Sequence, residues 1–122
     1  MRKNLSHKQS LKNALAGLWQ SFQTEKNLRV MVVISLVTLG AGFLLGISLL
    51  EFTIIVWAIF AVIAVEMINT SLEAITDLVK EEWHLQAKKA KDVSAGMVLL
   101  AAVSSGIIGI LIFLPKIYHL FF

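Results

Sequence analysis

Three apolar runs dominate this chain and limit what it can fold into. Residues 30–50 and 93–115 contain no charged side chain, and a helix of about 20 such residues crosses the hydrocarbon core of a bilayer. The third run begins at Phe52, meets an acid at Glu66 and continues in helix-forming residues to Val79. Because 57% of the residues are hydrophobic and 16% are charged, a soluble domain of this length is excluded. The sequence therefore predicts a single domain, residues 1–122, that is an all-α membrane protein with transmembrane helices at 30–50, 52–79 and 93–115.

Positive charge is concentrated in two of the segments outside these runs. The cations are Arg2, Lys3, Lys8, Lys12, Lys26 and Arg29 before the first run, and Lys80, Lys88, Lys89 and Lys91 between the second and third. Because cytoplasmic segments of membrane proteins carry an excess of Lys and Arg, we expect the N-terminus and the second connection to be cytoplasmic. The net charge of +3 reflects this placement and does not indicate nucleic-acid binding, and the absence of Cys excludes disulfides and thiolate metal sites.

The segment before the first run has the pattern of an amphipathic helix. Leu11, Leu15, Leu18 and Phe22 recur at steps of four, three and four, which places them on one helix face. Ser6 and Gln9 have the spacing of a capping box at its start. We expect residues 5–27 to form a helix in the headgroup region of the membrane. The simpler alternative is that this helix serves only as a membrane anchor.

A stripe of polar residues follows one face of the second predicted span. Its members, at steps of three, four and four, are Glu66, Asn69, Glu73 and Asp77. At about 100° per residue they fall within an arc of roughly 80°. Ionisable groups near lipid cost a few kcal/mol each, so such a stripe indicates function. Hydrogen bonding between helices is the alternative, and it would require only Asn69.

The chemistry of this stripe suits a divalent cation and an acid–base reaction. Mg²⁺ takes one or two protein carboxylates and completes its shell with water and substrate phosphates. Glu66 lies about 21 Å along the helix from Phe52, so it is the deepest acid of the stripe. We expect Glu66 to act as a general base on a substrate held in the membrane.

The second connection combines acids, an aromatic side chain, a His and several Lys residues. Its sequence is KEEWH at residues 80–84, followed by AKKAKD at 87–92. Such a set could contact the phosphates and base of a nucleotide. The alternative is a solvated turn in which Lys91 extends toward water and Asp92 is the N-cap of the third span. No Gly-rich GxxxxGK[ST] loop or protein-kinase motif is present, which excludes the familiar soluble nucleotide-binding folds.

The stretch VEMINTSLEAITDLVKEEWHLQAKKAKDVSAGMVLL, residues 65–100, closely resembles the small prokaryotic diacylglycerol kinase family. Its E-x-x-N-x-x-x-E-x-x-x-D core is long and specific, and the upstream SLKNALAGLWQSFQTEKNLR fits the family's amphipathic helix. The resemblance covers roughly residues 5–115. The DLV and EEWH segments are more similar to the Gram-positive branch, whose members phosphorylate undecaprenol.

This resemblance implies a role for each matching residue. Glu66 would be the general base, Asn69 would orient the site, and Glu25 and Glu73 would hold the Mg²⁺ that accompanies ATP. The remaining contacts to the nucleotide would come from Asn13, Glu82, Trp83, His84, Lys91 and Asp92. The resemblance also implies a homotrimer in a bacterial plasma membrane, with active sites on the cytoplasmic face that are shared between neighbouring chains.

Transfer of the γ-phosphate of MgATP to the primary hydroxyl of undecaprenol is therefore the predicted reaction. Diacylglycerol is the alternative acceptor, because both lipids present a primary hydroxyl on apolar tails. A proton-coupled transporter that uses Glu66 as its membrane carboxylate is an alternative of another class. A scaffold assembled through Gly42 and Gly46, which form a GxxxG pair, is a further alternative.

Overall fold

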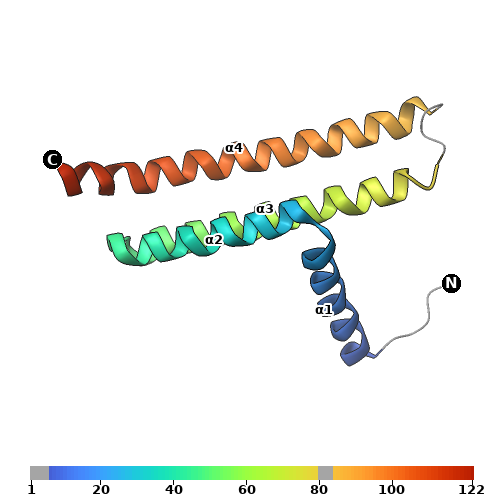
Figure 1. Cartoon of the computed structure of the whole chain (residues 1–122), viewed down its shortest axis with the longest axis horizontal. Coiled ribbons are helices and arrows are strands. Elements are labelled where there is room, and N and C mark those ends of the chain that lie inside the picture. The colour runs from blue at the N-terminus through green and yellow to red at the C-terminus, as the bar shows by residue number, and fades with distance from the viewer. Residues whose placement is uncertain (1–5, 80–83) are drawn as a thin grey trace.

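The computed structural model describes residues 6–79 and 84–122, and these residues form four helices (Figure 1). Helix α1 covers His7–Thr24, α2 covers Lys26–Leu45, α3 covers Leu49–Thr76 and α4 covers Leu85–Phe121. Helices α2, α3 and α4 run along the long axis of the molecule, and α1 departs from them at a steep angle. The last three helices are long and apolar enough to cross a membrane. The predicted all-α membrane fold, with a shorter helix before three spans, is confirmed.

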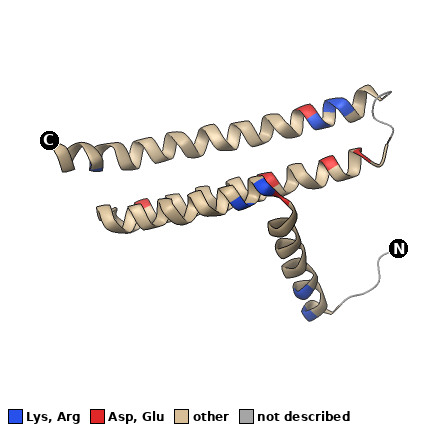
Figure 2. Ribbon diagram, viewed as in Figure 1, with Lys and Arg blue, Asp and Glu red and all other residues tan. Residues whose placement is uncertain are grey.

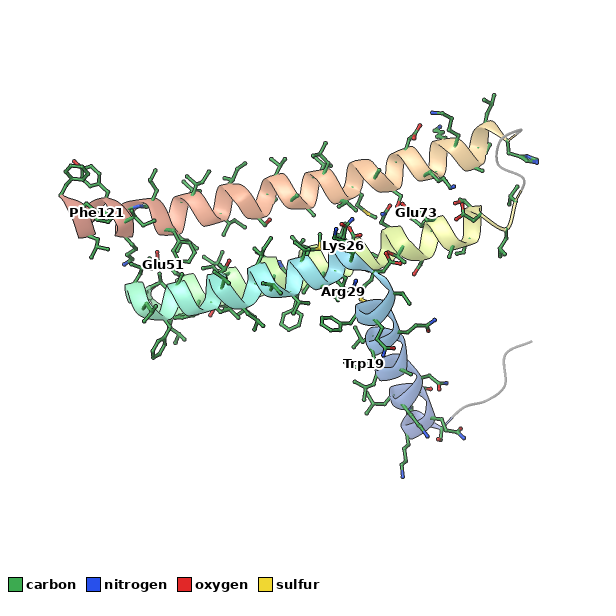
Figure 3. The ribbon with its side chains drawn as sticks, in the orientation of Figure 1. Trp19, Lys26, Arg29, Glu51, Glu73 and Phe121 are labelled. Atoms are coloured by element: carbon green, nitrogen blue, oxygen red, sulfur yellow. The ribbon has the colours of Figure 1, made fainter. Side chains whose placement is uncertain are left out.

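Helix α1 begins at the predicted capping box. The Ser6 hydroxyl accepts a hydrogen bond from the Gln9 amide, and the Gln9 side chain accepts one from the Ser6 amide, both at 3.2 Å. No residue of α1 is buried, and Trp19 on its apolar face is 61% exposed (Figure 3). Leu11, Leu15 and Leu18 are exposed as well, which suits a helix lying in the membrane interface.

A break at Glu25 separates α1 from α2. The Glu25 backbone is extended, with φ −104° and ψ 108°, so it ends one helix and precedes the next. The Arg29 side chain crosses this break: its Nη1 donates to the carbonyl oxygens of Phe22 at 3.0 Å and Gln23 at 2.6 Å. Arg29 thereby caps the end of α1 and sets the direction in which α1 leaves the bundle.

The turn between α2 and α3 explains why glycine is found at positions 42 and 46. Gly46 ends α2 in the left-handed conformation, with φ 68°, which a residue without a Cβ adopts at little cost. Ile47 then folds back, and its amide bonds the Gly42 carbonyl at 3.1 Å. A Cβ at position 42 would lie 2.7 Å from the Ile47 Cδ1 atom. Gly42 and Gly46 therefore serve this turn and the packing of Ile47, which joins Ile55 and Ile112 in the buried core.

Helix α4 is longer than the predicted third span. It begins at Leu85, with His84 as its N-cap, and continues through Pro115 to Phe121. The expectation that Asp92 caps this helix is wrong, because Asp92 lies two turns inside α4. There it pairs with Lys88, whose Nζ is 2.7 Å from Oδ2 of Asp92. Ion pairs between residues four apart stabilise exposed helical turns, and this one extends α4 beyond its apolar part.

Charged residues gather at one end of the three-helix bundle (Figure 2). They lie near the α1–α2 break, on the second half of α3 and on the first turns of α4. At the opposite end, the described charged groups are Glu51 and Lys116, whose side chains approach to 3.8 Å. This asymmetry places the polar stripe of α3 and the first turns of α4 at the same end of the bundle. The side of the membrane on which that end lies stays a prediction.

Candidate active site between the helices at the charged end

Glu66 is the buried acid of the polar stripe. Its side chain belongs to the third helix, α3, and the residue is only 5% exposed. Its electrostatic neighbours among the described residues are the Asn27 side chain and the carboxylates of Glu25 and Glu73. The α1–α2 break therefore brings Glu25, distant in sequence, into the electrostatic neighbourhood of Glu66, the predicted base.

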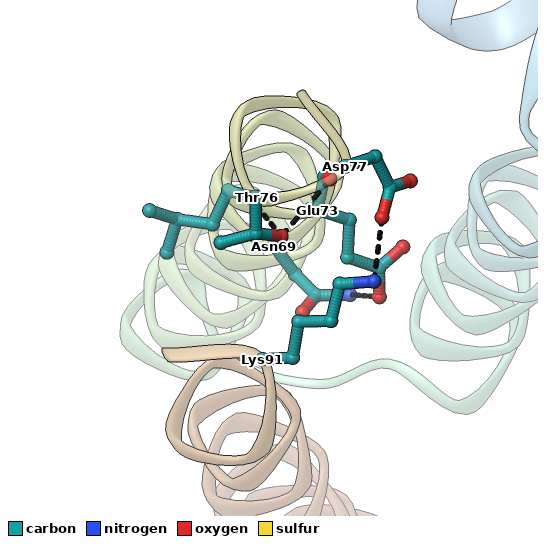
Figure 4. Close-up of polar contacts among 6 residues, drawn as sticks. Asn69, Glu73, Thr76, Asp77 and Lys91 are labelled. Atoms are coloured by element: carbon teal, nitrogen blue, oxygen red, sulfur yellow. Dashed lines mark hydrogen bonds and ion pairs between the residues drawn. The ribbon is translucent and has the colours of Figure 1, made fainter. Parts of the chain in front are cut away.

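Asn69 connects the stripe to α4. Its Nδ2 donates to the Glu73 Oε1 atom at 3.2 Å within α3 (Figure 4). Its Oδ1 accepts a hydrogen bond of 2.6 Å from the hydroxyl of Ser94 on α4. Both ends of the Asn69 amide are thus engaged, one toward a predicted metal ligand and one across the helix interface.

Lys91 and Asp77 form a second connection between α3 and α4. The Nζ atom of Lys91 lies 2.5 Å from Oδ1 of Asp77 (Figure 4). The Lys91 side chain is 33% exposed, against 59% for Asp77. A predicted phosphate-binding cation therefore lies at the rim of the site, in contact with the last member of the stripe.

Several predicted nucleotide contacts lie away from this cluster. Asp92 and Lys88 pair on an exposed part of α4, with side chains 65% and 72% exposed. His84 is exposed at the start of α4. Asn13 is exposed on α1 and is separated from Glu25 by about 18 Å of helix. The predictions for Glu82 and Trp83 lie outside the described residues.

Three residues near the site were missed in the sequence. Asn27 and Arg29 closely follow Glu25, and their roles depend on the backbone break there. Ser94 follows Lys91 by three positions, so both lie on one face of α4. That spacing is a usable signal, because it extends a polar face into an otherwise apolar run.

The carboxylates fit a metal that arrives with a substrate better than a metal held by protein alone. Among the described residues, no group of three or more His, Asp or Glu side chains is arranged to hold a metal ion. Glu25 and Glu73 lie on two different segments, and both act electrostatically on Glu66. One or two protein carboxylates, completed by phosphate oxygens and water, are the donor set that Mg²⁺ commonly uses.

A shallow groove between α3 and α4 borders the same cluster. Its lining is mainly apolar, with polar groups toward the end where the two helices are connected. The lining residues are Leu72, Gln86, Lys89, Ala90, Val93, Ser94 and Met97. Ser94 belongs both to this groove and to the hydrogen bonds around Asn69, so the groove reaches the polar site.

Three spanning helices with a carboxylate-rich site between them define a small membrane protein with an enzyme-like polar centre. Residues 12–113 match the family described as prokaryotic diacylglycerol kinase. The chain is 40% identical to the undecaprenol kinase of Bacillus subtilis, over 88% of each protein. It is 34% identical to the diacylglycerol kinase of Synechocystis sp., over 91% of this chain and 64% of that protein. It is 29% identical to the diacylglycerol kinase of Haemophilus influenzae, over 85% of this chain and 90% of that protein.

The chain therefore belongs to the prokaryotic diacylglycerol kinase family. It is a bacterial membrane protein and a lipid kinase, which carries out nucleotide-dependent phosphoryl transfer to a lipid. The predictions of the family and of the enzyme class are confirmed.

Proposed function

We propose that this protein transfers the γ-phosphoryl group of MgATP to the primary hydroxyl of undecaprenol, giving undecaprenyl phosphate and ADP. The observation that carries the proposal is the buried Glu66 carboxylate with Glu25 and Glu73 beside it. A carboxylate with few solvent contacts suits a base for a membrane-borne hydroxyl, and the two flanking acids suit the cation that accompanies ATP.

Glu66 takes the proton of the lipid hydroxyl in this mechanism. The hydroxyl oxygen forms its bond to the γ-phosphorus, and the bond from that phosphorus to the β–γ bridging oxygen breaks. Asn69 acts from the next turn, where its amide holds one oxygen of Glu73. The protein needs to supply little covalent chemistry for such a transfer, because position and charge provide most of the catalysis.

Glu25 and Glu73 are the residues that would hold Mg²⁺. When bound there, the ion would supply positive charge to offset that of the phosphates. Lys91 adds a cation from α4, and on ATP binding its ammonium exchanges Asp77 for a phosphate oxygen. The further proposed contacts to the nucleotide are Asn13, Glu82, Trp83, His84 and Asp92.

The proposed location of the site is the cytoplasmic face of the plasma membrane. The cluster of Lys and Arg at the charged end of the bundle supports this orientation. Helix α1 would then lie at the cytoplasmic interface, with Trp19 directed toward the membrane. We further propose a homotrimer with sites shared between chains, in which Asn13 reaches the nucleotide of a neighbouring chain. Native mass spectrometry should give three copies, and a monomer would contradict this part.

Undecaprenol is the first candidate for the acceptor because the Bacillus subtilis relative is an undecaprenol kinase. The apolar groove lined by Leu72, Val93 and Met97 offers a surface for a prenyl tail next to Ser94 and Asn69. Diacylglycerol is the second candidate, because the other two relatives are diacylglycerol kinases.

A panel of lipid acceptors tests the proposal. Purified protein is given radiolabelled ATP, Mg²⁺ and either undecaprenol, diacylglycerol or undecaprenyl acetate, in which the hydroxyl is blocked. We expect kcat/KM for undecaprenol to exceed that for diacylglycerol by about tenfold or more, with no labelling of the acetate. A preference for diacylglycerol would replace the acceptor, and labelling of neither alcohol would contradict the proposed function.

A further inference from the structure

Ser94 makes a hydrogen bond unlike those of the other described hydroxyl side chains within the spans. Ser35, Thr38 and Ser71 each donate to a carbonyl of their own helix, which is the usual arrangement for such residues. Ser94 is 2% exposed and its hydroxyl instead donates to Oδ1 of Asn69 on a different helix, at 2.6 Å. The Ser94 hydroxyl on α4 therefore binds a side chain of α3 across the helix interface.

Glu73 determines which way the Asn69 amide faces, and Ser94 holds the opposite end of that amide. A carboxylate accepts hydrogen bonds and has no proton to donate, so the end of the amide facing Glu73 is the nitrogen, at 3.2 Å. The oxygen end then faces Ser94, where a hydroxyl is available to donate. Glu73, Asn69 and Ser94 thus form a chain of hydrogen bonds with one direction throughout.

Glu73 is the outer end of this chain of hydrogen bonds and the residue proposed to hold the cation. Glu73 is exposed on α3, so its carboxylate has no buried surroundings that would hold one rotamer. The Asn69 amide engages Oε1 and leaves the other oxygen of Glu73 available. Hydrogen-bond partners behind a metal-binding carboxylate orient it, and their loss typically lowers metal affinity by about 10–100-fold.

We propose that Ser94 is a positioning residue of the phosphoryl-transfer site: its hydroxyl fixes the Asn69 amide, which in turn orients Glu73 toward the divalent cation of the nucleotide. This inference rests on the proposed role of Glu73. Ser94 does not touch the phosphates itself and acts only through Asn69.

The test measures cation binding without a lipid acceptor. Mn²⁺ serves as the probe for Mg²⁺, and its binding to the full protein with a non-hydrolysable ATP analogue is followed by electron paramagnetic resonance. Ser94→Ala should weaken Mn²⁺ binding by about tenfold. Ser71→Ala is the matched control, since its hydroxyl bonds only the Met67 carbonyl of its own helix, and it should bind as the wild type does.

A second pair of variants separates positioning from general support of the fold. In an Asn69→Ala background, adding Ser94→Ala should weaken Mn²⁺ binding no further, because the intermediate amide is already gone. An additional loss of similar size in that background would overturn the proposal, as would wild-type binding by Ser94→Ala alone. Because no lipid is present, a failure here is distinct from a failure of the acceptor panel.

Kinetics provide an independent readout of the same claim. In the complete lipid kinase assay, Ser94→Ala should raise the Mg²⁺ concentration for half-maximal rate by about tenfold. The KM for the lipid alcohol should stay as in the wild type. A raised lipid KM with unchanged Mg²⁺ dependence would assign Ser94 to the groove wall and overturn its positioning role.

Discussion

The ammonium of Lys91 lies 2.5 Å from the carboxylate of Asp77, which joins the first turns of α4 to the end of α3 at the rim of the site. Lys91 is the cation proposed to bind the phosphates, whereas Asp77 is 59% exposed and has no proposed contact with the substrates. The proposed mechanism therefore gives the two partners unequal roles although they form one pair.

This inequality predicts unequal effects of neutralising the two partners. Lys91→Met should lower kcat by about 100-fold or more, because a cation that stabilises the transferred group is lost. Asp77→Asn should change the KM for ATP by less than about fivefold, since exposed ion pairs contribute about 0–1 kcal/mol. Steady-state kinetics with varied ATP measures both. Equal losses in the two variants would assign Asp77 a direct role in the reaction.

Arg29 should affect the reaction through the placement of α1. Arg29→Met removes the hydrogen bonds to the Phe22 and Gln23 carbonyls, so α1 and Glu25 lose their fixed direction. Activity should fall by about 10–100-fold, since hydrogen bonds to a charged donor contribute about 1.5–3 kcal/mol. Hydrogen exchange should become faster in α1 and stay unchanged in α3 and α4. Lys26→Met, a neutralised cation at the same break, should change neither quantity. If Lys26→Met lowers activity as much as Arg29→Met does, the loss is caused by the change in net charge and the proposed role of Arg29 is wrong.

Gly42 should tolerate no side chain without a loss of stability. In Gly42→Ala the new methyl group would meet Cδ1 of Ile47 at 2.7 Å, so the buried Ile47 must shift. Such overpacking costs about 1–3 kcal/mol, which should lower the Tm in detergent by several degrees. Gly40→Ala is the control on the same helix, because a Cβ there meets no atom within 4 Å. A Tm for Gly42→Ala that matches that of the control would contradict the described turn.

Most of the fold could be predicted from the sequence, because long apolar runs and helix caps are local features. The capping box at Ser6 and the polar face from Glu66 to Glu73 were both predictable from spacing. The start of α4 at Leu85 was not predictable, because a polar helical turn and a solvated loop have the same composition. The Lys88–Asp92 ion pair that stabilises this turn forms only when the segment is already helical. The bond from Ser94 to Asn69 was also hidden. It depends on how α3 and α4 are rotated against each other, which periodicity within one helix does not determine.

The most direct test of the account is the turnover of Glu66→Gln beside its affinity for ATP. Removing the general base should lower kcat by about 10²–10⁴-fold. The affinity of Glu66→Gln for MgATP, measured by calorimetry, should equal that of the wild type. Glu51→Gln is the matched control, because Glu51 lies at the far end of the same helix and Gln retains its bond to the Ser48 amide. That variant should turn over as the wild type does. Wild-type turnover by folded Glu66→Gln would contradict the assignment of Glu66 as the base.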